Sequence, residues 1–142
     1  MALGLDTARE VVAGARKHAS SAGFKPMTVV VLDAGGHVVA AEREDGSSMS
    51  RFEIAFGKAH GALSLGMGSR SIMGRAEQQP YFIAAVTSAV GGALVPVPGG
   101  VLVRDADGTL LGAVGVTGDT SDNDEAAAVA GIEAAGLTAQ AE

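Results

Sequence analysis

Apolar positions follow two different periods along the chain, and the changes of period divide it into helices and strands. Over residues 5–19 they recur at the spacing of one helical face, which predicts a first helix that ends at Gly23. We expect Asp6 or Thr7 to cap this helix. Glu10 stands three residues after Thr7, as a capping-box partner would.

Two segments carry β-branched runs around a tight turn. The first pair of β-branched runs lies on either side of VLDAGG (31–36), and the second lies on either side of VRDADG (103–108). The two turns share Asp, Ala and the final Gly. Aspartate followed by glycine between apolar runs is typical of a β-hairpin. The sequence therefore predicts two hairpins. The similarity of their turns is explained either by the physical recurrence of Asp-x-x-Gly turns or by an internal duplication.

Three more helices and one more strand complete the pattern. Ser48 or Ser50 is expected to cap a helix over 51–65, and Gly66 and Gly68 follow its end. The remaining predictions are a shorter helix over 69–79 limited by Pro80, a strand around Ala93–Val97, and a last helix Asp124–Gly136 capped by Ser121 or Asp122.

The order of these elements defines the fold class. Strands joined by tight turns pair antiparallel, whereas parallel strands need a long crossover. The sequence therefore predicts an α+β fold with an antiparallel sheet of five strands, covered by helices. No linker of useful length divides the chain, so we expect a single domain.

Composition and charge exclude several functions. The chain has no cysteine, so thiolate chemistry and disulfides are excluded, and its 47% apolar residues include no Trp. A formal net charge of −6 offers no basic surface to nucleic acid or to an anionic membrane. The sequence shows no signal peptide and no apolar run long enough to span a membrane, so we expect a cytoplasmic protein.

The helix over 51–65 carries the main candidate site. At about 100° per residue, Lys58 and His60 fall on opposite flanks of a core face that contains Phe52 and Phe56. Lys58 is then either a boundary lysine or an anion contact, and His60 either a hydrogen-bonded flank residue or a ligand contact. Glycine is costly within a helix, so the glycines beside them suggest close approach by another backbone, a second subunit or a flat ligand.

Other polar clusters have simpler explanations. The three histidines lack the spacing of a metal site, and the glycine-rich runs lack the signatures of nucleotide-binding loops. We predict no metal site built by the protein alone. Capping of the last helix accounts for the acidic segment with Ser121, Asp122, Asp124 and Glu125.

Five motifs occur in an order that resembles a known family: R-E-D-G (43–46), G-K-A-H-G-A (57–62), P-G-G (98–100), L-G-A-V-G-V-T-G (111–118) and D-E-A-A-A-V-A-G (124–131). The chain is similar over residues 3–137 to the GlcG/HbpS-like family, also described as haem-degrading or DUF336, which includes the C-terminal domain of PduO-type proteins. The resemblance implies a five-stranded antiparallel sheet with flanking helices in the profilin or roadblock style. It also implies self-assembly, from dimers up to octamers.

The same resemblance implies a ligand near the 51–65 helix, because some family members bind haem. Carried over by position, Lys58 and Ala59 match the family motif, His60 fills its variable position, and Gly61 replaces a common threonine. If haem binds, His60 would be the axial ligand and Lys58 or Arg51 would pair with a propionate.

Three functions follow from these observations. The first is a homo-oligomeric small-molecule-binding protein whose ligand, haem or a related compound, contacts Arg51, Lys58, His60 and Gly61 at a subunit interface. The second is a cofactor-free enzyme, of lyase or isomerase type, acting on a small carbonyl or carboxylate metabolite with His60 as general base. The third is an assembly protein without a ligand.

Overall fold

A computed structural model describes residues 2–142. It contains five helices and five strands, and the observed order of elements along the chain is α1 (Leu5–Ala22), β1 (Thr28–Asp33), β2 (Val38–Arg43), α2 (Arg51–Leu65), α3 (Ser69–Gln78), α4 (Pro80–Ala89), β3 (Gly100–Arg104), β4 (Leu110–Thr117), α5 (Ser121–Ala134) and β5 (Thr138–Gln140).

The strands form one antiparallel sheet in the order β2-β1-β4-β3-β5. Both predicted hairpins are present, as β1–β2 and β3–β4. Their turns are held alike, because Asp33 Oδ1 accepts from the amides of Gly35 and His37, while Asp105 Oδ1 accepts from those of Asp107 and Thr109. The α+β class and the five-stranded antiparallel sheet predicted from the sequence are confirmed.

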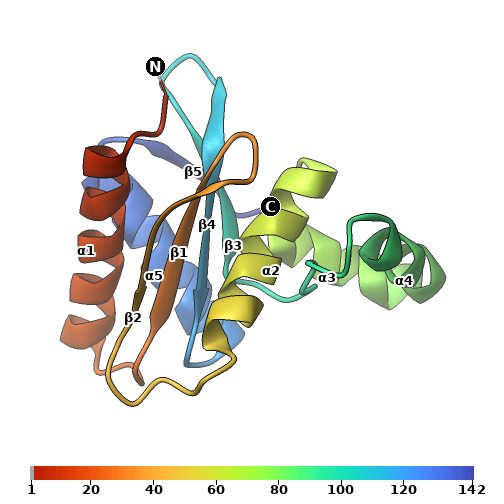
Figure 1. Ribbon diagram of the computed structural model, residues 1–142, viewed down its shortest axis with the longest axis horizontal. Helices are drawn as coiled ribbons and strands as arrows, with labels where there is room; N and C mark the ends of the chain where they lie inside the picture. Colours follow the sequence, from red (N-terminus) through yellow and green to blue (C-terminus); the bar gives the residue numbers. More distant parts are fainter. Residues whose placement is uncertain (1) are drawn as a thin grey trace.

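Helices cover both faces of the sheet, as Figure 1 shows. On one face α1 and α5 pack together and share a core with alternate side chains of β1, β3 and β4. Gly131 of α5 lets the two helices approach closely, because a Cβ there would lie 2.4 Å from the carbonyl oxygen of Val11. On the other face α2 lies over Val30, Leu32, Leu102 and Ala113.

The segment between α2 and β3 differs from its prediction. Pro80 does not only limit α3; it occupies the first turn of α4, where its fixed φ suits a helix start. The predicted strand Ala93–Val97 is wrong, since this segment runs beside α2 and not in the sheet, and Val95 N donates to Gly57 O. The fifth strand is instead β5, which pairs with β3 near the C-terminus.

The predicted helix caps are mostly wrong in detail. Helix α1 starts after Gly4, and neither Asp6 nor Thr7 caps it. Ser50 is the residue before α2 but makes no side-chain cap. Thr120, not Ser121 or Asp122, caps α5, and its Oγ1 accepts from Asn123 N. None of the helices in residues 2–142 combines the length and apolar character that crossing a membrane requires.

Candidate functional site

The buried face of α2 overlaps the predicted one but is rotated towards Lys58. The buried side includes Ala55, Ala59 and Ala62, but it also takes in Lys58, whereas Phe52 is 36% exposed and Phe56 is only half-buried. Small residues make this rotation possible. Gly115 of β4 lies so close beneath α2 that a Cβ there would clash with the Ala55 carbonyl oxygen.

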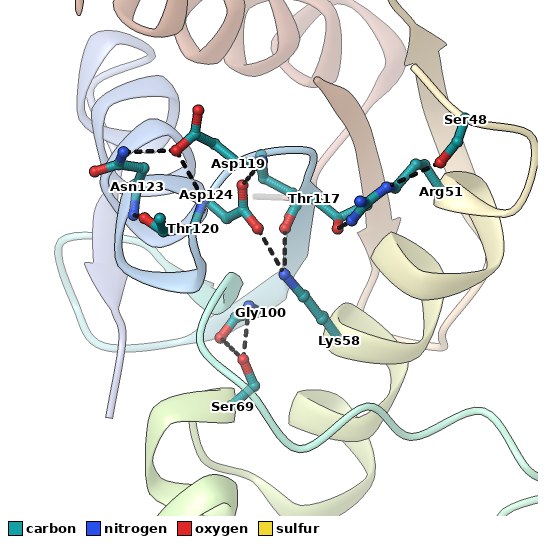
Figure 2. Close-up of polar contacts among 11 residues, drawn as sticks. Ser48, Arg51, Lys58, Ser69, Gly100, Thr117, Asp119, Thr120, Asn123 and Asp124 are labelled. Atoms are coloured by element: carbon teal, nitrogen blue, oxygen red, sulfur yellow. Dashed lines mark hydrogen bonds and ion pairs between the residues drawn. The ribbon is translucent and has the colours of Figure 1, made fainter. Parts of the chain in front are cut away.

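Lys58 is an interior residue and not a boundary lysine. Its side chain is 2% exposed, and Nζ donates to Asp124 Oδ2 at 3.0 Å and to the Val116 carbonyl at 2.9 Å, as Figure 2 shows. Because both charged groups are buried, each needs the other. Removing one would leave an uncompensated charge in the core.

Burial acts on both members of this pair. Desolvation lowers the pKa of Lys58, opposed by the attraction of Asp124, and the positive charge of Arg51 lowers it further. Desolvation likewise raises the pKa of Asp124, opposed by the charge of Lys58 and by a hydrogen bond from the Asp119 amide. The geometry, with direct contact at 3.0 Å and both groups hydrogen-bonded, fits an ion pair that joins α2 to α5.

The turn before α5 positions Asp124. Asp119 Oδ1 accepts from Thr120 N and from Asn123 Nδ2, while its Oδ2 accepts from Lys25 N. These donors lower the pKa of Asp119 to about 2. Asp124 was assigned from the sequence to capping, and that prediction is wrong, because its carboxylate points inward to Lys58 (Figure 2).

The P-G-G segment closes over Lys58. A Cβ at Gly99 would lie 2.8 Å from Lys58 Nζ, and one at Gly100 would lie 2.2 Å from the Lys58 carbonyl oxygen. Gly99 also has a φ of 124°, which L-residues with side chains rarely adopt. The buried hydroxyl of Ser69 bonds to both Gly100 N and Gly100 O. These glycines therefore serve the packing around the lysine.

Arg51 lies two turns before Lys58 on the same flank. Its Nε donates to Ser48 Oγ at 3.1 Å and its Nη1 donates to Thr117 Oγ1 at 2.8 Å. Both acceptors are neutral hydroxyls. Arg51 therefore lies close to the buried pair but is not one of its members (Figure 2).

His60 lies on the opposite flank and is half-buried. Its Nδ1 is 2.8 Å from the Ala93 carbonyl oxygen, and its ring stacks on Phe56 with centroids 5.3 Å apart. Phe56 in turn stacks on Phe52 at 6.0 Å, so three rings form a ladder along α2. We call Phe52, Phe56 and His60 the aromatic flank.

Gly57 and Gly61 are explained by the chain itself. A Cβ at Gly57 would lie 2.7 Å from Val95 Cγ2, and a Cβ at Gly61 would lie 2.9 Å from Leu94 Cγ. Of the three partners expected from the sequence, the close neighbour is another backbone segment. Leu94 covers Gly61, so threonine could not replace it without a shift of this segment.

The structure thus divides the predicted site residues. It brings Arg51 and Lys58 together on one flank and places His60 on the other, in agreement with the helical geometry predicted from the sequence. Sequence reasoning missed Asp124 as the partner of Lys58. A lysine within an apolar stretch of helix was the only signal for it, because a buried charge requires a partner.

The other two histidines are not part of this site. His18 contacts the Phe24 ring edge at 5.8 Å between centroids. His37 is exposed and pairs with Asp33 in the β1–β2 turn. In residues 2–142 no group of three or more His, Asp or Glu side chains could hold a metal ion.

The fold and the site together define an α+β protein with a sheet between two helical layers, an internal lysine–aspartate pair, and one exposed aromatic helix flank. The chain belongs to the HbpS-like family. Residues 3–133 match the family model described as haem degrading protein HbpS-like.

Solved structures agree with this assignment. A PduOC–haem complex is 23% identical, with a TM-score of 0.85 over 96% of this chain and 97% of that one. Klebsiella pneumoniae ORFY is 26% identical, with a TM-score of 0.82 over 93% and 89%. A double mutant of Streptomyces reticuli HbpS is 27% identical, with a TM-score of 0.79 over 94% and 86%. No curated protein sequence matches the chain.

Proposed function

We propose that the protein is a cytoplasmic homo-oligomer that binds haem, or a flat ligand of similar chemistry, on the aromatic flank of α2 at an interface between two copies. The observation that carries this proposal is the hydrogen bond from His60 to the Ala93 carbonyl. A carbonyl only accepts, so Nδ1 holds the proton and a neutral imidazole then presents an unprotonated Nε2. Metal-ligating histidines are held in the same way by a second hydrogen bond.

The surroundings of His60 fit an apolar macrocycle. Phe56 stacks on the imidazole and fixes its orientation, and Phe52 extends the apolar surface by one turn. His60 would be the axial ligand, and bound haem would supply iron-centred redox or ligand-binding chemistry. The family to which the chain belongs is described as haem degrading, and this description supports haem as the ligand.

A second copy would complete the site. Lys58 forms a buried ion pair with Asp124 and is therefore not available to a propionate. Arg51 lies on the far flank, so a propionate of haem at His60 would meet Arg51 of another copy. Gly61 contributes by admitting the 94–95 segment, whose neighbour Ala93 orients the histidine.

Exposed apolar surface supports self-association. Residues 78–103 contain no charged side chain, and α4 within this segment buries only Ile83 while Tyr81 is 71% exposed. Figure 1 shows α4 projecting from the rest of the molecule beyond α3. With a net charge of −6, two copies repel one another in general, so an uncharged projection is a favourable place for contact.

Haem titration tests the proposal. The protein should shift the Soret band of added haem, and His60→Ala should abolish that shift. His37→Ala removes an exposed histidine on the β1–β2 turn and serves as the matched control, with an unchanged spectrum expected. No shift with the wild-type protein, or equal loss in both variants, contradicts haem ligation by His60. Light scattering with and without haem measures the oligomer.

The same nitrogen favours a second candidate, a cofactor-free enzyme. An unprotonated Nε2 fixed by Ala93 is suited to act as a general base on a small carbonyl or carboxylate metabolite. A thermal-shift screen of such metabolites would reveal a stabilising compound. Turnover of that compound should lose its near-neutral pH dependence in His60→Gln, whereas a protein that only assembles would respond to none of the compounds.

A further inference from the structure

A separate cavity of about 200 Å³ opens beside Arg51, on the flank of α2 that faces away from His60. Lys25 and Arg51 line it together with Ser47 and Ser48. Gly46 and Gly118 complete the wall, and both have positive φ, 87° and 152°. A Cβ at Gly118 would clash with the Pro26 carbonyl oxygen, so glycine allows the two backbone segments to approach closely at this wall.

Arg51 is held in place without being neutralised. Ser48 Oγ and Thr117 Oγ1 each accept one of its five N–H groups, which fixes the guanidinium and leaves three donors. Within residues 2–142, no carboxylate lies within ion-pair distance of Arg51. By contrast, Arg16 and Arg70 each contact two carboxylates. A fixed, half-buried guanidinium with donors to spare is suited to bind an oxyanion.

The charges around the cavity favour an anion. Lys25 supplies a second cation, and no carboxylate lines the cavity. Asp119 is a nearby acid that stays ionised and attracts Lys25, but neither Asp119 nor Asp45 belongs to the lining of the cavity. Towards the protein interior, the two cations Arg51 and Lys58 lie near a single carboxylate, that of Asp124, which pairs with Lys58. An anion beside Arg51 would offset this excess positive charge.

We propose that this cavity binds a small oxyanion, a carboxylate or phosphate group, between Arg51 and Lys25. The cavity is small and opens to solvent, and it has room for a group of the size of inorganic phosphate or a short carboxylic acid. Binding of a small oxyanion here needs neither His60 nor the aromatic flank, although the haem proposal also uses Arg51, from another copy, for a propionate.

Titration of the haem-free protein tests the proposal. Inorganic phosphate and acetate are added in separate series at constant ionic strength with chloride as the balancing anion, followed by thermal shift and by amide NMR shifts of residues 46–48. Arg51→Gln and Lys25→Gln should each weaken binding by about tenfold or more, the loss expected for one charge-assisted hydrogen bond. Arg9→Gln and Lys17→Gln remove the same charge from exposed positions of α1 and should stay within about twofold of wild type.

The outcomes separate the possibilities. A response to phosphate alone or to acetate alone identifies which oxyanion the site binds. Either response supports the site if Arg51→Gln and Lys25→Gln lose it. No response to either, or equal losses in the α1 controls, overturns the proposal. Lys25→Gln keeps the test valid if Arg51→Gln fails to fold, since Lys25 is exposed. His60→Ala should bind the anion normally, which distinguishes this site from the haem proposal.

Discussion

The two flanks of α2 differ in how completely the rest of the chain buries their side chains and supplies hydrogen-bond partners. On the first flank Lys58 is enclosed, and its ammonium is hydrogen-bonded to Asp124 and Val116. On the second flank the stacked rings of Phe52, Phe56 and His60 remain partly exposed, with only one hydrogen bond, from His60 to Ala93. One flank of the helix is therefore enclosed and fully hydrogen-bonded, whereas the other flank remains partly exposed.

This difference separates structural from functional motif residues. Lysine and histidine stand two positions apart in G-K-A-H-G-A, and both are chemically versatile, yet the lysine is committed to folding. It links α2 to the start of α5 past the end of the central strand β4, and the P-G-G segment encloses it. The aromatic flank can change its partners without disturbing this buried pair, which is why the haem proposal uses that flank.

The largest expected effect is on the enclosed flank. Lys58→Met should reduce the free energy of unfolding by about 3–5 kcal/mol, because it leaves the Asp124 carboxylate buried without its cation. Asp124→Asn keeps an acceptor for the Asp119 amide. The double variant Lys58→Met/Asp124→Asn should therefore be more stable than Lys58→Met alone. Urea denaturation of the wild type, both single variants and the double variant measures the coupling, and strictly additive losses would contradict a coupled pair.

A smaller effect is expected at the glycines between the flanks. Gly61→Ala should destabilise by about 1–3 kcal/mol, because its Cβ would lie 2.9 Å from Leu94 Cγ and the packed segment must move. Gly74→Ala in α3 is the matched control. It has no neighbour within 4 Å, so alanine should stabilise by up to about 1 kcal/mol through helix propensity. Opposite signs in thermal unfolding confirm the close approach, and stabilisation by both contradicts it.

The periodicity predicted most of the fold but not the partners of α2. Both hairpins and the central helix followed from local pattern, since turn residues and apolar spacing act over a few positions. The 93–97 segment failed because its apolar residues, which resemble a buried strand, cover α2 instead. The fifth strand at Thr138–Gln140 is too short to carry a pattern of its own.

The site was predicted only as far as helical geometry reaches. The opposite flanks of Lys58 and His60 followed from their spacing of two residues. Asp124 lies 66 positions from Lys58, and no local rule connects them. The rotation of the core face towards Lys58 was also missed, because Phe52 and Phe56 are more apolar than the lysine and the two glycines that are buried in their place. Their exposure is a tertiary outcome that marks the candidate surface.

A pH-dependent effect should follow from Asp119, which supports the enclosed flank through Asp124. Its folded pKa of about 2 lies below the ordinary 3.8, because N–H donors favour the carboxylate. The group therefore stabilises the fold fully above about pH 3.8 and loses this contribution as the pH falls towards 2. Asp119→Asn should be less stable than wild type at pH 5–7, and the difference should vanish near pH 2. A difference that stays constant in urea denaturation from pH 2 to 7 would exclude this titration.

The smallest change in stability is expected on the aromatic flank. Phe52 is 36% exposed in the single chain, so about two thirds of its surface is buried and Phe52→Ser should lower the free energy of unfolding by about 1–2 kcal/mol. If the flank binds haem between two copies, the same substitution should weaken haem binding and dimerisation by a larger free energy than it costs the fold. Glu53→Ser, at the neighbouring solvent-facing position, is the control. Haem titration and light scattering on both variants, set against their unfolding curves, make the comparison. A loss of binding no greater than the loss of stability would place Phe52 with Lys58, as a residue that serves only the fold.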